Sequence, residues 1–152
     1  MRILVVSDSH GDYLSLREAI EMQQNASVLI HLGDGERDLE KCMMLCKGMR
    51  IVRVRGNCDF ASDAPPYELV TVGGKNIYCT HGFAERVKSG DYELLYRARG
   101  FGAHIVLYGH THTPVNRYED GLYIFNPGSV ADGNYGIVDI TPSGTVCVDM
   151  KL

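Results

Sequence analysis

Seven side chains of the kinds that bind divalent metal ions follow short apolar runs in this chain of 152 residues. They fall in five segments, and each segment joins an apolar run to an Asp, His or Asn and a nearby glycine: Val5–Gly11, Ile30–Gly35, Val54–Asp59, Tyr78–Gly82 and Leu107–His112. Open α/β sheets bind ligands at the carboxyl ends of their strands. We therefore expect these side chains to gather along one edge of the sheets.

The spacing inside two of these segments suits metal binding. Asp8 and His10 form an Asp-x-His pair, and His110 and His112 form a His-x-His pair. Alternate residues of an extended segment point the same way, so each pair can reach one ion or two adjacent ions. Taken singly, each fragment is explained better by an ordinary turn, since Asp and Gly are common turn residues. Five such endings in one short chain are not explained by turns alone.

The composition is that of an ordinary globular protein, with 45% hydrophobic and 22% charged residues, and the length predicts a single domain over residues 1–152. A net charge of -4 argues against extended, sequence-independent nucleic-acid binding. The apolar run at 3–6 is too short for a signal peptide or a membrane span. The five cysteines include no C-x-x-C pair, which indicates reduced thiols. We expect a cytoplasmic protein without a membrane partner.

Alternating strand and helix patterns occupy the first third of the chain. Apolar runs predict strands at 3–6, 28–30 and 51–55. Between them, Asp12 is placed to cap a helix that runs through Ile20, and a second helix is predicted from about Leu39 to Cys46. Strand and helix in this order imply right-handed crossovers and a parallel sheet.

The pattern changes after Asp59. Runs at 67–72 and 77–80 flank two glycines and predict a hairpin, and a helix at 92–99 and a strand at 104–108 follow. From Val115 onward the short alternating runs predict only strands. A mixed two-sheet β-sandwich flanked by helices accommodates this order better than one doubly wound sheet, so the predicted fold class is α/β.

Six motifs, taken as a set, carry a family resemblance. They are DSHG at 8–11, GDG at 33–35, GNCD at 56–59, THG at 80–82, GHTH at 109–112 and NPGS at 126–129. In order and spacing they resemble the calcineurin-like metallophosphoesterases, in the branch of small single-domain bacterial and archaeal phosphodiesterases to which the retromer scaffold subunit is also related. The resemblance covers residues 8–129 and implies a four-layer αββα architecture.

The resemblance implies two divalent metal ions. The first would be held by Asp8, His10, Asp34 and His112. The second would be held by Asp34, Asn57, His81 and His110, so that Asp34 bridges both. Nitrogen and oxygen ligands without a thiolate suit manganese, nickel, iron or zinc better than calcium, and the family favours manganese.

The implied reaction is hydrolysis of a small phosphodiester by a hydroxide that bridges the two ions. The residues expected to take part in catalysis are Asp34, Asn57, Cys58, Asp59 and His81. Many members of the superfamily have a histidine where this chain has Cys58, and a thiol is a weaker donor than an imidazolium. We therefore expect little help for poor leaving groups. No activating base for Cys58 as a nucleophile is evident.

Two other functions remain open on the same fold. One is a catalytically silent scaffold that binds proteins, as the retromer relative does, and the other is a phosphomonoesterase or nuclease. A scaffold should have lost several metal ligands, whereas all seven positions here keep them. The expected partner is a small phosphoester, and a homo-oligomer is compatible with the sequence.

Several polar residues near the motifs have two interpretations each. His31 is either a partner that orients a ligand or a plain strand-end histidine, and Asp59 either orients a ligand or caps a turn. Asp38 is expected in the first turn of a helix rather than as a ligand. Arg55 is interpreted as a solvated strand-end residue, with phosphate binding as the alternative. Phe60 and Tyr67 are interpreted as core aromatics, with cover for a base or an aromatic leaving group as the alternative.

Overall fold

A computed structural model describes all residues, 1–152. The first third alternates strands and helices as the sequence predicts: β1 (Arg2–Val6), α1 (Tyr13–Met22), β2 (Val28–His31), α2 (Glu36–Cys42), the 3₁₀ helix η1 (Met43–Cys46) and β3 (Arg50–Arg53). The three strands pair in parallel. Asp12 caps α1, because its side chain accepts a hydrogen bond from the Ser15 N–H at 3.1 Å.

The remaining elements are mostly strands, in the order β4 (Tyr67–Val72), β5 (Lys75–Thr80), η2 (Val87–Ser89), α3 (Tyr92–Gly100), β6 (Ile105–Leu107), β7 (Val115–Glu119), β8 (Leu122–Asn126), η3 (Val130–Asp132), β9 (Asn134–Thr141) and β10 (Gly144–Lys151). The predicted hairpin is confirmed, since β4 and β5 pair in antiparallel fashion around Gly73 and Gly74. These two glycines have φ of 55° and 76°, which suits a tight hairpin turn.

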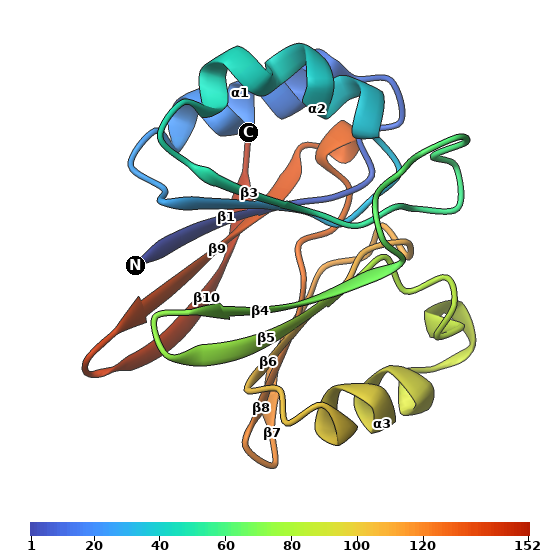
Figure 1. Ribbon diagram of the computed structural model, residues 1–152, viewed down its shortest axis with the longest axis vertical. Helices are drawn as coiled ribbons and strands as arrows, with labels where there is room; N and C mark the ends of the chain where they lie inside the picture. The colour runs from blue at the N-terminus through green and yellow to red at the C-terminus, as the bar shows by residue number, and fades with distance from the viewer.

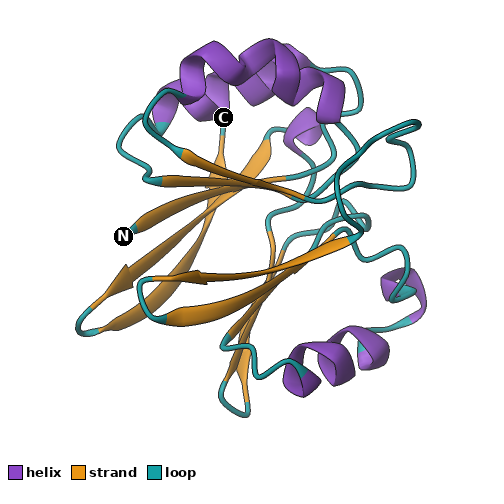
Figure 2. Cartoon of the chain, in the orientation of Figure 1, coloured by secondary structure: helices purple, strands orange, loops and turns teal.

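Two five-stranded sheets form the sandwich. One has the order β10-β9-β1-β2-β3 and the other β4-β5-β6-β8-β7. Helices α1 and α2 cover the outer face of the first sheet, and α3 covers the outer face of the second (Figure 1). Figure 2 shows the resulting layers of helix, sheet, sheet and helix. The predicted fold class is therefore confirmed.

Side-chain alternation along β1 explains how the layers hold together. Ile3 and Val5 point into the cluster between the two sheets, together with Ile77 and Leu107 of the opposite sheet. Leu4 and Val6 point the other way and pack against Leu16 and Ile20 of α1, in the cluster under the helices. A strand buried on both faces reads as the unbroken apolar run seen in the sequence. None of the helices combines the length and apolar character needed to cross a bilayer.

Two predicted element boundaries are wrong. Helix α2 begins at Glu36, three residues before Leu39, and its last predicted turn is the 3₁₀ helix η1. Gly35 at its N-cap has no side chain to mark the start, and the Glu36 N–H is instead bonded by the Asp59 carboxylate from a distant loop, at 3.1 Å. Strand β3 ends at Arg53, because the Arg55 N–H leaves the sheet to bond the Pro65 carbonyl.

Candidate metal centre

The loops after β1, β2, β3, β5 and β6 bring the predicted ligands to one edge of the sandwich. Three groups of residues each bring their potential ligand atoms within 4.8 Å of one another. These are Asp8 with His10 and His112, Asp34 with His81 and His110, and His10 with Asp34 and Cys58. Asn57 belongs to the same place, since its Oδ1 lies 3.0 Å from His81 Nε2. All seven predicted ligand residues thus come together.

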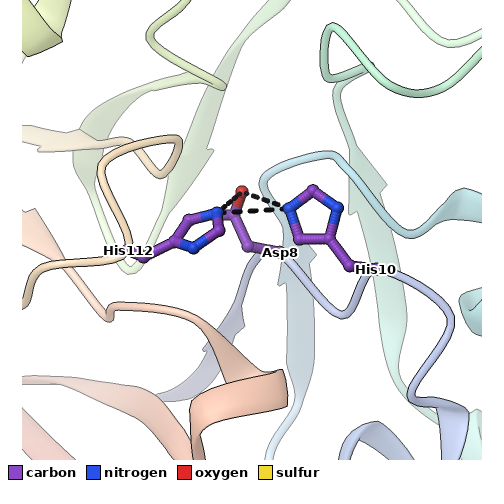
Figure 3. Close-up of side chains that lie close together, drawn as sticks. All are labelled: Asp8, His10 and His112. Carbon is purple, nitrogen blue, oxygen red and sulfur yellow. Dashed lines mark hydrogen bonds and ion pairs between the residues drawn. The ribbon is translucent and has the colours of Figure 1, made fainter.

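Asp8 is the centre of the first group (Figure 3). Its Oδ1 lies 3.5 Å from His10 Nε2 and 3.2 Å from His112 Nε2, and the two imidazole nitrogens are 3.2 Å apart. The other oxygen, Oδ2, accepts hydrogen bonds from Ser7 Oγ at 2.5 Å and from the His110 N–H at 3.0 Å. Asp8 is fully buried, yet its Oδ1 has no hydrogen-bond partner. A buried carboxylate oxygen without a partner is costly, and a cation held by these three residues would satisfy it.

Asp34 lies between the two groups of ligands. Its Oδ2 is 3.7 Å from His10 Nε2 and 3.3 Å from His81 Nε2, while its Oδ1 accepts a hydrogen bond from the Cys58 N–H at 2.7 Å. Burial opposes ionisation of Asp34, but His81 and the Cys58 N–H outweigh it, so the pKa of Asp34 lies well below its usual range. The carboxylate is therefore charged and in reach of ligands on both sides.

His81 is oriented from behind. Its Nδ1 lies 2.7 Å from the Leu32 carbonyl oxygen, which only accepts, so Nδ1 carries the proton and Nε2 faces the ligands. Burial lowers the pKa of His81, but the carboxylates of Asp34 and Asp8 raise it by more than burial lowers it. The pKa of His81 therefore lies above its usual value. A cation bound at Nε2 would displace the proton that the imidazolium carries on that nitrogen, which makes metal affinity depend on pH.

Five of the seven predicted ligands have left-handed backbone. The φ angles are 57° at Asp8, 46° at His10, 56° at Asp34, 68° at His110 and 59° at His112. Their spacing suggested an extended backbone for the Asp-x-His and His-x-His pairs. That expectation is wrong, because both residues of each pair have positive φ. Each lies on a tight loop that turns away from its strand, and this turn aims the side chains at the common point. Strained backbone of this kind clusters at functional sites.

Asp59 holds the Asp34 loop through backbone contacts. Its carboxylate accepts four hydrogen bonds, from the N–H groups of Asp34 (2.7 Å), Gly56 (2.8 Å), Gly35 (3.0 Å) and Glu36 (3.1 Å). Both oxygens are thereby occupied. The geometry favours a positioning role for Asp59 over direct participation in the reaction.

Asp38 does the same for the loop that carries His10. Its Oδ2 accepts hydrogen bonds from Ser9 Oγ at 2.6 Å and from the Gly11 N–H at 2.8 Å. Asp38 lies in the first turn of α2, as predicted, but its buried side chain and these contacts could not be seen in the sequence. No local pattern links residues that lie 27 and 29 positions apart.

The remaining polar residues near the site have supporting roles. His31 is buried, accepts a hydrogen bond from the Gly33 N–H at 3.2 Å, and has a pKa lowered to about 4 by burial, so it is neutral and supports the Asp34 loop. His104 is structural, because its Nδ1 accepts from the Asn76 N–H on the neighbouring strand. The Ser129 hydroxyl donates to the Asp8 carbonyl. Asn126 donates to the Gly109 carbonyl, so both residues brace ligand loops.

Cys58 lies at the surface beside the ligands. Its thiol belongs to the group with His10 and Asp34 and is exposed. Desolvation and then the negative charge of Asp34 raise the pKa of Cys58, which keeps the thiol protonated at neutral pH. A protonated thiol is a poor nucleophile.

A phosphoesterase fold and a cluster of metal-ligand residues define the class of protein. The chain belongs to the calcineurin-like phosphoesterase superfamily, whose domain model matches residues 1–143. Among curated proteins it is similar to the probable metallophosphoesterase YsnB of Bacillus subtilis, with 32% identity over 86% of this chain and 75% of that protein. It is also similar to the phosphodiesterase YfcE of Escherichia coli, with 28% identity over 91% of this chain and 88% of that protein.

Solved structures agree with the fold. A predicted phosphoesterase from Streptococcus pneumoniae matches with a TM-score of 0.77 and 28% identity over 98% of this chain and 97% of that one. Vps29 of Entamoeba histolytica, in a structure with Zn²⁺, matches with a TM-score of 0.73 and 20% identity over 99% of each chain. The second likeness concerns the fold alone.

Proposed function

We propose that this chain is a phosphodiesterase that hydrolyses a small phosphodiester with the help of two divalent cations, manganese being the first choice. The observation that carries the proposal is the position of Asp34, whose Oδ2 lies within 3.7 Å of a histidine from each ligand group. A carboxylate oxygen has more than one lone pair, so Oδ2 alone can serve a cation on each side. The free Oδ1 of buried Asp8 supports a cation in the first group independently.

The charges of the site suit a phosphate ester. Two divalent ions would bring about +4, would lower the pKa of a bound water and would polarise the phosphoryl oxygens. Asp8 and Asp34 return about -2, since the imidazoles and the Asn57 amide add no negative charge. The net positive charge attracts an anionic diester. Asn57 and His81, whose side chains lie 3.0 Å apart, are close enough to act on the same ion.

The residue at position 58 bears on the choice of leaving group. Cys58 offers a thiol, which is a weak hydrogen-bond donor compared with an imidazolium. The alcohol that leaves must therefore carry much of its own negative charge, and diesters with acidic leaving groups, such as p-nitrophenol, should react fastest. The products would be a phosphate monoester and that alcohol.

A catalytically silent scaffold is the second candidate, and the likeness of the fold to Vps29 is what favours it. The retention and assembly of all seven ligand residues support the enzyme instead. A phosphomonoesterase or nuclease would use the same ligands, and substrate comparison distinguishes them.

The test is to strip the protein of metal and restore manganese, nickel, zinc or magnesium one at a time. Bis(p-nitrophenyl) phosphate is compared with p-nitrophenyl phosphate as substrate, and bound metal is counted. We expect faster turnover of the diester and a stoichiometry near two ions per chain. No turnover of either substrate with any metal, together with no bound metal, would refute the enzyme.

Two substitutions test the roles of the residues. Asp34→Asn should lower kcat/KM by more than about 100-fold, beyond the ~10–100-fold typical of residues that only orient ligands. Cys58→Ala should cost less than about tenfold, because a protonated thiol contributes little as a donor. Equal losses in the two variants would mean that the role of Cys58 has been misjudged.

A further inference from the structure

Two hollows adjoin the candidate metal centre. The α2 hollow, of about 380 Å³, touches His10 and Asp34 and continues along the first turns of α2. The second hollow, of about 310 Å³, touches Asn57 and His81. The loop after β3 separates them, since it contributes Asn57 to one and Cys58 to the other. A phosphodiester has two substituents, and each hollow has room for one beside a different set of ligands.

Four carboxylates line the α2 hollow: Asp34 belongs to the candidate metal centre, and the other three are engaged by the protein itself. Asp59 accepts four backbone hydrogen bonds, and Asp38 accepts hydrogen bonds from Ser9 and Gly11. Glu36 forms an ion pair with Arg53. Their oxygens are thus hydrogen-bonded or ion-paired elsewhere in the protein, and none of them pairs with Arg37.

Arg37 is the unpaired cation of this hollow. Lys41 also lines it, but its ammonium lies 3.7 Å from Asp38 Oδ1 and 5.0 Å over the ring of Tyr13. Arg37 is exposed and makes no side-chain hydrogen bond or ion pair with any residue. Its guanidinium is therefore free to bind a ligand. Phe60, which is 81% exposed, lines the same hollow and offers an unpacked aromatic ring.

We propose that the α2 hollow binds a substituent that carries both a planar ring and a second anionic group, as a nucleoside with a phosphate on its other hydroxyl does. Arg37 would be the residue that selects the anionic group. A guanidinium presents a planar fork of donors that matches phosphate oxygens, and an exposed aromatic ring provides a stacking surface for a base. The proposal deepens the proposed function and rests on it for the position of the scissile phosphate.

Binding is the first test, because it does not depend on turnover. Manganese-loaded protein is titrated calorimetrically with thymidine 3′,5′-bisphosphate and with thymidine 5′-monophosphate, which differ by one phosphate. We expect the bisphosphate to bind about tenfold more tightly to the wild type, as one charge-assisted contact allows. Arg37→Ala should reduce this ratio to below about twofold, whereas Arg37→Lys should keep part of it.

Lys47→Ala is the matched control, because Lys47 is exposed, lines neither hollow, and its loss changes the net charge by the same amount. The tenfold ratio should persist in it. Phe60→Ala should weaken both nucleotides at least about fivefold relative to inorganic phosphate. A wild-type ratio near one, or equal ratios in wild type and Arg37→Ala, would overturn the proposal. Loss of the affinity ratio in Lys47→Ala to the same extent as in Arg37→Ala would also overturn the proposal.

Turnover then separates this inference from the proposed function. The p-nitrophenyl ester of thymidine 5′-phosphate is compared with the same ester carrying a 3′-phosphate, and the ratio of their kcat/KM values should follow the binding ratio in each variant. If neither ester nor bis(p-nitrophenyl) phosphate is hydrolysed while Arg37 still discriminates the nucleotides, the proposed activity fails and the binding site stands. If hydrolysis occurs without discrimination, the site fails and the activity stands.

Discussion

Replacing Asp59 with alanine should loosen the loop that carries Asp34 and thereby the metal centre. The substitution removes the acceptor of four backbone hydrogen bonds of 2.7–3.1 Å. At about 1 kcal/mol net for each bond, the four contribute about 4 kcal/mol. Asp59 is half-buried, so water can replace some of these contacts. We therefore expect the free energy of unfolding to fall by about 2–3 kcal/mol.

The assay is urea unfolding followed by circular dichroism, with Asp63→Ala as the control. Asp63 lies on the same loop, is 85% exposed in its side chain, and forms a surface ion pair with Arg53. Its loss should change the free energy of unfolding by less than about 0.5 kcal/mol. Manganese affinity should fall about 10–100-fold in Asp59→Ala, because the residue orients a ligand loop. Equal stability of wild type and Asp59→Ala would refute this role.

The pH dependence gives an independent check. Burial opposes the charge on Asp59, but the four N–H donors outweigh it and hold the pKa of Asp59 below its usual value. Its stabilising contribution is therefore complete above the unfolded pKa of about 3.9 and is lost as pH falls through the lower folded pKa. The stability gap between wild type and Asp59→Ala should be constant near neutrality and narrow below about pH 4. A gap that stays constant in acid would contradict the charge-based account.

Three further outcomes follow from the same contacts. Gly109→Ala should abolish metal binding in a calorimetric titration, because a Cβ there would lie 2.0 Å from Ser7 Oγ; normal binding would show that the loop can move aside. Glu85→Gln should lower the free energy of unfolding in urea by about 2 kcal/mol, since it weakens a buried 2.5 Å hydrogen bond from Tyr78; an unchanged midpoint would contradict this. Adding manganese should raise the Tm of the wild type by several degrees and that of Asp34→Asn much less, as measured by calorimetry; equal shifts would mean that the ion binds elsewhere.

The sequence predicts the layers well because buried strands appear in it as unbroken apolar runs. The runs at 3–6 and 28–30 are apolar on both faces, and the structure buries both faces of β1 and β2. The gathering of the candidate ligand residues was also predictable, since each lies a few residues after an apolar run. Their chemistry and their place at strand ends are both local properties.

What the sequence did not predict depends on contacts between distant residues. The start of α2 is fixed by Asp59, which lies 23 positions after Glu36, so no local capping pattern exists at Gly35. The roles of Asp38 and Asp59 as supports of ligand loops have the same origin. The backbone of the Asp8 loop is another case, because nothing in a single residue type announces a left-handed φ at an aspartate.

The left-handed backbone at five ligand positions also bears on how such a domain can evolve. Each strained non-glycine residue costs on the order of 1–3 kcal/mol, and the fold tolerates that cost only while the ligands are needed. A descendant that no longer needed to bind metal would gain stability from a substitution by glycine or asparagine at almost any of these positions. Such substitutions would lie above the stability threshold that selection enforces, so this backbone would make loss of the candidate ligands easier than their return.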